Sequence, residues 1–159
     1  MKIVRRAVLP LRVLLVLTFA LLVVFQVLSM PGQFAHMARE HPDEAWLRWP
    51  MTVWSTLEIG CVQVVIVCTW RLLGLVQADR IFTERALAWV DAIVAAVGAG
   101  WLLLAALWVF VGVQADDPGA PMLLTLLLLI GAVLGLLMLV LRELLRQATT
   151  LRTDLEAVI

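Results

Sequence analysis

Four long apolar runs divide the chain, and short polar segments separate each run from the next. Three runs contain no charged residue, at 13–30, 92–113 and 122–141, and a fourth at 51–70 contains one acid, Glu58. Each has roughly 18 to 22 residues, which as a helix is enough to cross about 30 Å of hydrocarbon. Helix is the expected form because an open strand leaves backbone groups unpaired in lipid. We therefore predict four transmembrane helices, at about 9–30, 50–74, 86–114 and 121–145.

The composition supports this all-α membrane class. Hydrophobic residues make up 64% of the chain, whereas about half of a soluble domain is apolar. The 12 basic and 12 acidic residues balance, so no overall field attracts nucleic acid. No segment between the runs is long enough for a soluble domain, and we predict one membrane domain over 1–159, a four-helix bundle. Cys61 and Cys68 lie about 10 Å apart along one helix, so both are expected to be free thiols.

The first apolar run differs from a cleaved signal peptide. It follows the basic sequence MKIVRR, but its apolar stretch is longer than the usual length of about 7–15 residues. No A-x-A cleavage pattern follows it in PGQFAHMA. We therefore expect this run to be a retained membrane anchor.

Lysine and arginine are distributed unevenly around the four predicted spans. Most of them fall on one side, and only Arg39 and Arg48 fall on the other. Short loops rich in Lys and Arg stay in the cytoplasm, so we expect both termini and the 75–85 hairpin on the cytoplasmic side of the membrane. The segments at 31–49 and 114–121 then face outward, the first as an interfacial loop with a short helix. The residues on the inner side are Lys2, Arg5, Arg6, Arg12, Arg71, Arg80, Arg85, Arg142, Arg146 and Arg152.

The 75–85 hairpin contains residue types that favour the N-terminus of a helix. Thr83 can cap the third helix, Glu84 lies in its first turn, where the helix dipole favours an acid, and Phe82 can pack on Leu87. Local structure therefore accounts for most of the charge that gathers at this hairpin.

The sequence IFTERALAWVDAIV, which contains Phe82-Thr83-Glu84, resembles the pattern before the third span in a family of small bacterial membrane proteins, domain of unknown function 2975. The four-span layout and the length are similar over most of the chain, and the composition resembles actinobacterial members. The resemblance implies a four-helix inner-membrane protein without assigned catalytic residues. Family members are often encoded beside a small helix-turn-helix regulator, which implies a signalling partnership.

Glu58 is an acid inside a predicted span, about 12 Å along the helix from Pro50. No Lys or Arg of any predicted span comes to that depth. Two interpretations stay open: a site for a proton, a cation or a small cationic molecule, and an interhelical hydrogen-bond network. The polar residues expected at a comparable depth are Gln26, Ser55, Thr56 and Thr125.

Asp91 lies just inside the third span, where an unpaired carboxylate is costly. Arg71 and Arg142 end their own spans at a similar depth. We predict an ion pair that ties the third span to the second or the fourth through one of these arginines. A proton-relay or ligand role and simple extension of the side chain to water are the alternatives.

Small residues recur at four-residue spacing in the last two spans. Such ridges let helix backbones approach closely in lipid. We expect them to pack within one bundle, although a seam between two copies fits the pattern as well. The residues are Gly131 and Gly135 in the fourth span, and Ala92, Ala96 and Gly100 in the third.

The C-terminal tail, 142–159, is amphipathic and is predicted to continue the fourth span as one helix in the cytoplasm. Its apolar residues recur at alternating spacings of three and four, the pattern of a coiled-coil stripe. The stripe either packs on the 75–85 hairpin or the membrane surface, or binds a partner protein or a second copy. It consists of Leu141, Leu144, Ala148, Leu151, Leu155 and Val158.

The chain contains no recognisable catalytic motif, and the outer sequence HMAREHPDE lacks the spacing of a metal site. Pro42 in that sequence fits the first position of a short helix. We predict no enzyme activity, catalytic residue, metal or cofactor. The favoured function is an accessory or signalling protein that acts through protein contacts at the cytoplasmic face of the lipid bilayer. The alternative is a small proton- or cation-coupled transporter that uses Glu58.

Overall fold

The computed structural model describes the backbone of residues 2–78, 83–114 and 118–158. Of the residues named above, Arg80 and Phe82 lie outside the described residues, as do the side chains of Lys2, Arg5, Arg6 and Val158. The chain divides into two compact units, Met1–Ile66 and Val67–Ile159.

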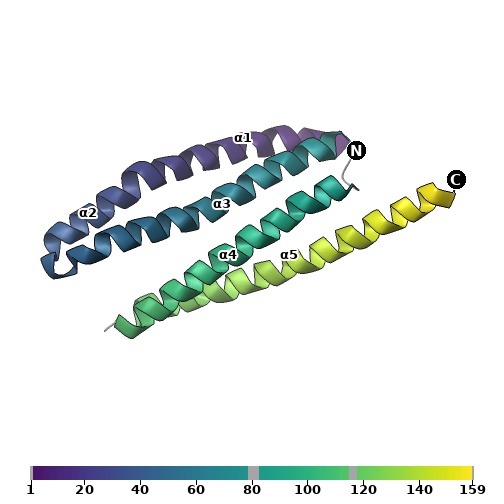
Figure 1. Cartoon of the computed structure of the whole chain (residues 1–159). Coiled ribbons are helices and arrows are strands. Elements are labelled where there is room, and N and C mark those ends of the chain that lie inside the picture. Colours follow the sequence, from purple (N-terminus) through teal and green to yellow (C-terminus); the bar gives the residue numbers. More distant parts are fainter. Residues whose placement is uncertain (1, 79–82, 115–117, 159) are drawn as a thin grey trace. The chain divides into compact units, whose positions relative to one another are not determined.

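Every element of the described residues is a helix (Figure 1). Four segments are long and apolar enough to cross a membrane by length and composition, which confirms the predicted all-α class with four long apolar helices. The elements in chain order are α1 (Lys2–Val24), the π-helical turn η1 (Phe25–Ser29), α2 (Met30–Glu40), the 3-10 helix η2 (Pro42–Leu47), α3 (Arg48–Gln77), α4 (Glu84–Gln114) and α5 (Gly119–Val158).

In the first unit, α1, η1 and α2 follow one another without a break and bend on the way (Figure 1). Pro31 lies at the start of α2, where it lacks an N–H group and its ring crowds the carbonyl group of residue 27. The π-helical turn at Phe25–Ser29 widens the helix at this point and accommodates the proline. This local widening sets the position of Gln26, which lies within the turn.

The first helical stretch ends at Glu40, so much of the segment expected as an outer loop is helical. His41 breaks the helix with φ −122° and ψ 83°, outside the helical region. Pro42 then begins the short helix η2, with Asp43 and Glu44 in its first turn, which confirms the short helix predicted there. Proline and acids are favoured at these positions because the first N–H groups of a helix have no partner and carry positive charge.

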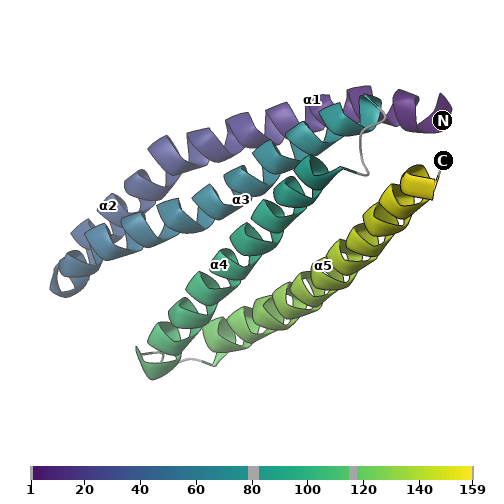
Figure 2. The same ribbon diagram turned by 45° about the vertical axis from the view of Figure 1, so that its right-hand side comes forward.

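In the second unit, α4 and α5 lie side by side and run antiparallel (Figures 1 and 2). Helix α5 has 40 residues, about 60 Å of helix, without an interruption. It is therefore about twice as long as the hydrocarbon thickness of a bilayer, about 30 Å. The predicted continuation of the fourth apolar span as one helix is confirmed.

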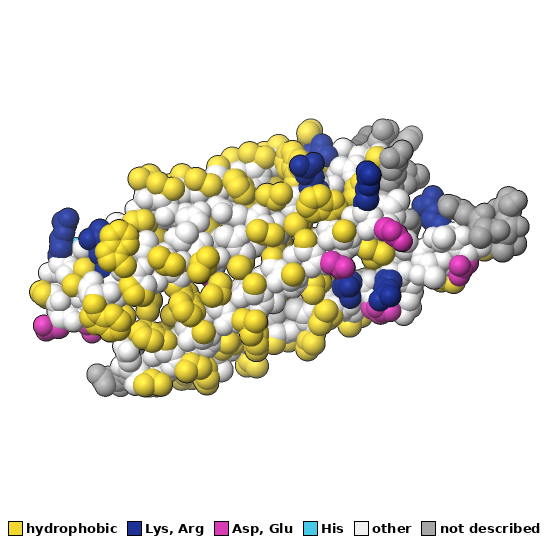
Figure 3. Space-filling view, viewed as in Figure 1, with side chains coloured by type: hydrophobic (Ala, Val, Ile, Leu, Met, Phe, Trp, Pro, Cys, Tyr) yellow, Lys and Arg dark blue, Asp and Glu magenta, His cyan; other side chains and the backbone are white. Residues whose placement is uncertain are grey.

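The buried core of the described residues is small and consists mainly of side chains such as Ile66, Ala86 and Ile93. Long leucine and valine side chains instead cover the outside of the helices, and charged side chains gather toward the helix ends (Figure 3). Apolar surface of this extent is not stable in water, whereas it matches hydrocarbon. The surface therefore agrees with a chain that resides in a lipid bilayer.

Candidate functional sites

A polar contact joins the first and second apolar helices inside the first unit. The side-chain amide of Gln26, in η1, donates to the carbonyl oxygen of Thr56 at 3.2 Å. The amide of Gln63, in α3, donates to Gln26 Oε1 at 3.0 Å. The two bonds use one donor and the acceptor of Gln26. The contact therefore resembles interhelical hydrogen bonding of the kind that stabilises membrane helix pairs.

Gln63 was not among the residues singled out from the sequence. The signal that points to it is its position seven residues after Thr56, which is two helical turns and hence the same face of α3. Gln26 could be recognised as a polar residue within a span, but the π-helical turn that directs it toward α3 is not evident from periodicity.

Glu58 lies on a different face of α3 from Gln63, because five residues correspond to about 140° of rotation. Its Oε2 atom is buried and has no hydrogen-bond partner among the described residues. Trp54 lies four residues earlier, and its Nε1 atom is also buried without a hydrogen-bond partner among the described residues. Residues four apart lie on one helix face. A free hydrogen-bond acceptor and a free donor thus occupy consecutive turns of α3.

The other polar residues predicted near Glu58 have partners of their own. The hydroxyl group of Ser55 donates within α3, with the carbonyl oxygens of Met51 at 2.9 Å and Thr52 at 3.1 Å as acceptors. Thr56 takes part in the Gln26 contact through its carbonyl oxygen. Two of the predicted polar residues, Gln26 and Thr56, are therefore brought together.

Thr125 belongs to the second unit, where its hydroxyl group bonds to neighbours on α4 and α5. Trp108 Nε1 donates to Thr125 Oγ1 at 2.8 Å, and Thr125 Oγ1 donates to the carbonyl oxygen of Pro121 at 2.8 Å. The hydroxyl group thus acts as both acceptor and donor, and it joins α4 and α5 at the end where α4 ends and α5 begins.

Asp91 of α4 pairs with Arg142 of α5, whose Nε atom donates to the Asp91 carboxylate. Both side chains are partly exposed. Arg71, the other arginine expected near Asp91, lies with its guanidinium carbon 5.8 Å from the ring centre of Trp89, a cation–π contact between α3 and α4. The two arginines therefore bind α4 from two neighbouring helices within the second unit.

Small residues form the seam between α4 and α5. A Cβ atom at Gly131 would lie 3.0 Å from Trp101 Cδ1, and one at Gly135 would lie 4.0 Å from Val97 Cγ1. Trp101 Nε1 donates to the carbonyl oxygen of Leu128 at 2.9 Å. The indole ring thus packs where Gly131 has no side chain, and it is tied to the helix that carries the glycine. On α4, Ala96 is buried, whereas Ala92 and Gly100 are half-buried.

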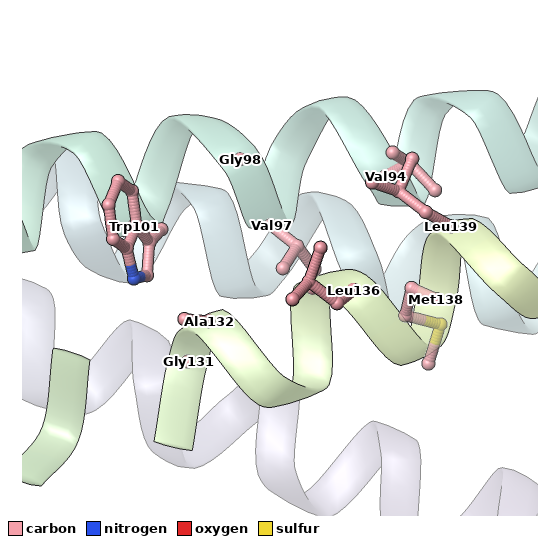
Figure 4. Close-up of a pocket in the computed structure, with 10 residues that line it drawn as sticks. Val94, Val97, Gly98, Trp101, Gly131, Ala132, Leu136, Met138 and Leu139 are labelled. Atoms are coloured by element: carbon pink, nitrogen blue, oxygen red, sulfur yellow. The ribbon is translucent and has the colours of Figure 1, made fainter. Parts of the chain in front are cut away.

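An apolar groove of about 310 Å³ lies along this seam, with Trp101 at one end and Val94 and Leu139 at the other (Figure 4). Glycines of both helices make room for it, since Gly98, Gly131 and Gly135 are part of the wall. The side chains that line the groove are apolar except for the indole N–H group of Trp101, which already donates to the carbonyl oxygen of Leu128.

The tail stripe of α5 is largely uncovered. The exposed fractions are 56% for Leu144, 64% for Leu151 and 68% for Leu155. Leu141 is exposed to a lesser degree, and Ala148 is half-buried. Most of the predicted stripe is therefore exposed on the surface of α5.

The two cross-helix pairs of the second unit define its register. Asp91 and Trp108 on α4 are separated by as many residues as Thr125 and Arg142 on α5. At this register, Glu84, the first residue of α4, lies level with Thr149 of α5. Thr149 is one of the few buried residues of the second unit, in agreement with this register. The last turns of α5 therefore extend beyond the beginning of α4.

Helix α2 has one weak ionic contact within itself. His36 Nε2 lies 3.6 Å from Glu40 Oε1 on the exposed surface of α2. No group of three or more His, Cys, Asp or Glu side chains suited to a metal ion occurs among the described residues. Cys61 and Cys68 are free thiols.

Four apolar helical segments of membrane-crossing length, together with polar pairs inside them, define a multi-pass helical membrane protein. A family model described as "Protein of unknown function (DUF2975)" matches residues 32–159. The chain belongs to this family, which confirms the resemblance noted from the sequence. No curated protein and no solved structure matches the chain.

Proposed function

We propose that this protein is a non-enzymatic accessory or signalling protein of the bacterial cytoplasmic membrane, and that it acts by binding another protein through the end of α5. The observation that carries the proposal is the exposure of Leu151 and Leu155 on the part of α5 that extends beyond the beginning of α4. The uneven distribution of Lys and Arg supports a cytoplasmic location for this end.

The length of α5 supports the same conclusion. A helix of about 60 Å cannot be contained in about 30 Å of hydrocarbon, so its last turns emerge from the bilayer. Leucines that emerge on one face of a helix form the kind of surface that binds in the groove of a partner. Polar and charged residues fill the remaining positions, which keeps the end of the helix soluble until it is bound.

Site-specific photo-crosslinking in cells tests the proposal. A photoreactive residue at Leu151 or Leu155 is expected to give one discrete adduct, and the same residue at Thr150 or Thr153, on other faces of the helix, is expected to give much less. An adduct of twice the mass of the chain identifies the partner as a second copy. Equal, diffuse labelling from all four positions contradicts the proposal.

A second candidate function is a small proton- or cation-coupled transporter that uses Glu58. The buried Oε2 atom without a hydrogen-bond partner favours it, since an acid in this setting is costly unless a proton or cation binds there. Protein reconstituted in vesicles is then expected to carry a proton or a cation across the membrane. The Glu58→Gln variant is expected to abolish this transport. Equal movement in Glu58→Gln contradicts this candidate.

A further inference from the structure

Two arginines and a tryptophan lie together near the end of α3 and the beginning of α4, within the second unit. The guanidinium carbon of Arg71 lies 5.8 Å from the ring centre of Trp89. Arg85 lies one turn before Trp89 on α4, so the two side chains start from the same face of that helix. Both arginines are exposed, whereas Trp89 is half-buried. Two positive charges and one indole ring therefore share a small surface.

The positive charge of this surface is not cancelled within the described part of the chain. No acid among the described residues forms an ion pair with Arg71 or Arg85, and the carboxylate of Asp91 is bound by Arg142. Glu84 directly precedes Arg85, but successive side chains of a helix point about 100° apart. Contact with the indole face orients Arg71 without removing its charge. The surface thus keeps a net positive charge even when Glu84 is counted, and an anion is attracted to it.

The position of the surface along the helices favours a lipid headgroup over an anion in water. The apolar run at 51–70 ends one residue before Arg71, and the run at 92–113 begins three residues after Trp89. Arginine and tryptophan at such boundaries lie at the level of the lipid headgroups. Val67 lies one turn before Arg71 on the same face of α3 and is 46% exposed. An apolar surface therefore continues from the cations toward the hydrocarbon, and a ligand with an anionic head and an acyl chain matches both parts.

We propose that Arg71 and Arg85, together with Trp89, form a binding site for the headgroup of an anionic phospholipid. The planar guanidinium group donates two parallel hydrogen bonds to phosphate oxygens. Basic groups between membrane helices bind anionic headgroups in this way. Trp89 holds Arg71 at the headgroup level, and an acyl chain lies along α3 beside Val67. The inference goes beyond the proposed function and depends neither on docking through α5 nor on Glu58.

Two lipids that differ in net charge test the site. Dioctanoylphosphatidylglycerol is anionic, whereas dioctanoylphosphatidylcholine has the same acyl chains and no net charge. Native mass spectrometry of the full chain in an uncharged detergent measures the binding of each lipid over a range of concentrations. The anionic lipid is expected to bind more tightly. Equal dissociation constants for the two lipids overturn the proposal.

Glycerol phosphate separates a lipid site from a site for a soluble phosphate, because it has the same anionic group without acyl chains. At equal concentration it is expected to leave dioctanoylphosphatidylglycerol bound, since it has no apolar part to lie beside Val67. Displacement of the lipid by equimolar glycerol phosphate assigns the surface to soluble phosphates and overturns the lipid assignment.

Three variants that each remove one arginine assign the selectivity to this surface. Arg71→Gln and Arg85→Gln are each expected to weaken dioctanoylphosphatidylglycerol by about fivefold, the usual contribution of one basic residue near an anionic membrane surface. Binding of dioctanoylphosphatidylcholine should be unchanged. Arg39→Gln removes an equal charge from the exposed surface of α2 and is the matched control. An equal loss in Arg39→Gln, or no loss in Arg71→Gln and Arg85→Gln, overturns the site.

Trp89→Leu tests the indole ring separately from the charges, because it keeps both arginines but removes the contact that holds Arg71. It is expected to weaken dioctanoylphosphatidylglycerol by roughly 2- to 5-fold, the usual contribution of an exposed cation–π contact. Thermal unfolding and unchanged binding of dioctanoylphosphatidylcholine check that each variant is folded. Unchanged affinity for the anionic lipid in folded Trp89→Leu overturns the role of the ring.

Discussion

Arg142 of α5 and Asp91 of α4 form an ion pair between two helices that are otherwise joined mainly by apolar contacts. The pair fixes the register of the α4–α5 hairpin, together with the contact between Trp108 and Thr125 at its other end. That register leaves the last turns of α5 beyond the beginning of α4, which is where the exposed leucines lie. The register that the ion pair stabilises therefore also leaves the proposed docking surface on α5 uncovered by α4.

Asp91→Asn is expected to lower the thermal unfolding midpoint, because Arg142 loses its charged acceptor. The decrease should be modest, since both side chains are partly exposed and salt screens such a pair. Arg142→Gln should give a similar decrease, and the double variant should lie close to either single variant because the two residues act together. Glu143→Gln is the control. A double variant whose loss equals the sum of the two single losses contradicts a direct pair.

Gly131→Ala is expected to destabilise the chain by about 1–3 kcal/mol, the usual cost of overpacking. The new Cβ atom lies 3.0 Å from Trp101 Cδ1, so the indole ring must move, and its hydrogen bond to Leu128 is disturbed. Gly98→Ala is the matched control, because nothing lies within 4 Å of a Cβ atom there. Unfolding in a denaturing detergent measures both. If Gly98→Ala proves as harmful as Gly131→Ala, the close approach of Trp101 is not the cause.

Gln63→Leu is expected to cost on the order of 0.6 kcal/mol, the typical contribution of an interhelical hydrogen bond in a membrane. It removes the bond to Gln26 Oε1 and leaves the bond from Gln26 to the carbonyl of Thr56. Gln26→Leu removes both bonds and should cost more. The same unfolding assay measures them, with Gln33→Leu on an exposed position of α2 as control. A larger loss for Gln63→Leu than for Gln26→Leu would falsify this hierarchy.

Replacement of Leu151 and Leu155 by Glu is expected to leave the unfolding midpoint nearly unchanged, because both side chains are exposed in the isolated chain. The same change should abolish the crosslinked adduct from a photoreactive residue at Leu144, which lies on the same stripe. Thr150→Glu with Thr153→Glu adds equal charge on other faces and should leave the adduct in place. Persistence of the adduct in the leucine double variant argues against docking through this surface.

The sequence predicted the four apolar helices because hydrocarbon imposes a length and a composition that few other structures share. It also indicated the partners available to Asp91, since cations are scarce at that depth and Arg142 is one of two. Which arginine forms the pair depends on the register of α4 against α5. That register is set by the contacts along the whole seam, which include the packing of Trp101 over Gly131, and periodicity does not contain such a three-dimensional fit.

The polar residues inside the first two helices were predicted less completely. Depth along a helix placed Gln26 and Glu58 at a similar level, but depth does not specify the face of the helix. The π-helical turn at Phe25–Ser29 changes the direction of Gln26, and Gln63 becomes its partner. Glu58 lies on another face of α3, beside Trp54. A local departure from regular helix geometry thus decided which polar residues meet.

The proposed function depends most on α5 carrying its exposed leucines into the cytoplasm. Paired reporters fused after Ile159 measure this directly: a fluorescent protein that matures in the cytoplasm and a phosphatase that is active only outside it. We predict bright fluorescence and no phosphatase activity, because the uneven distribution of Lys and Arg residues favours a cytoplasmic C-terminus. Phosphatase activity without fluorescence would place the end of α5 outside and contradict the proposed function.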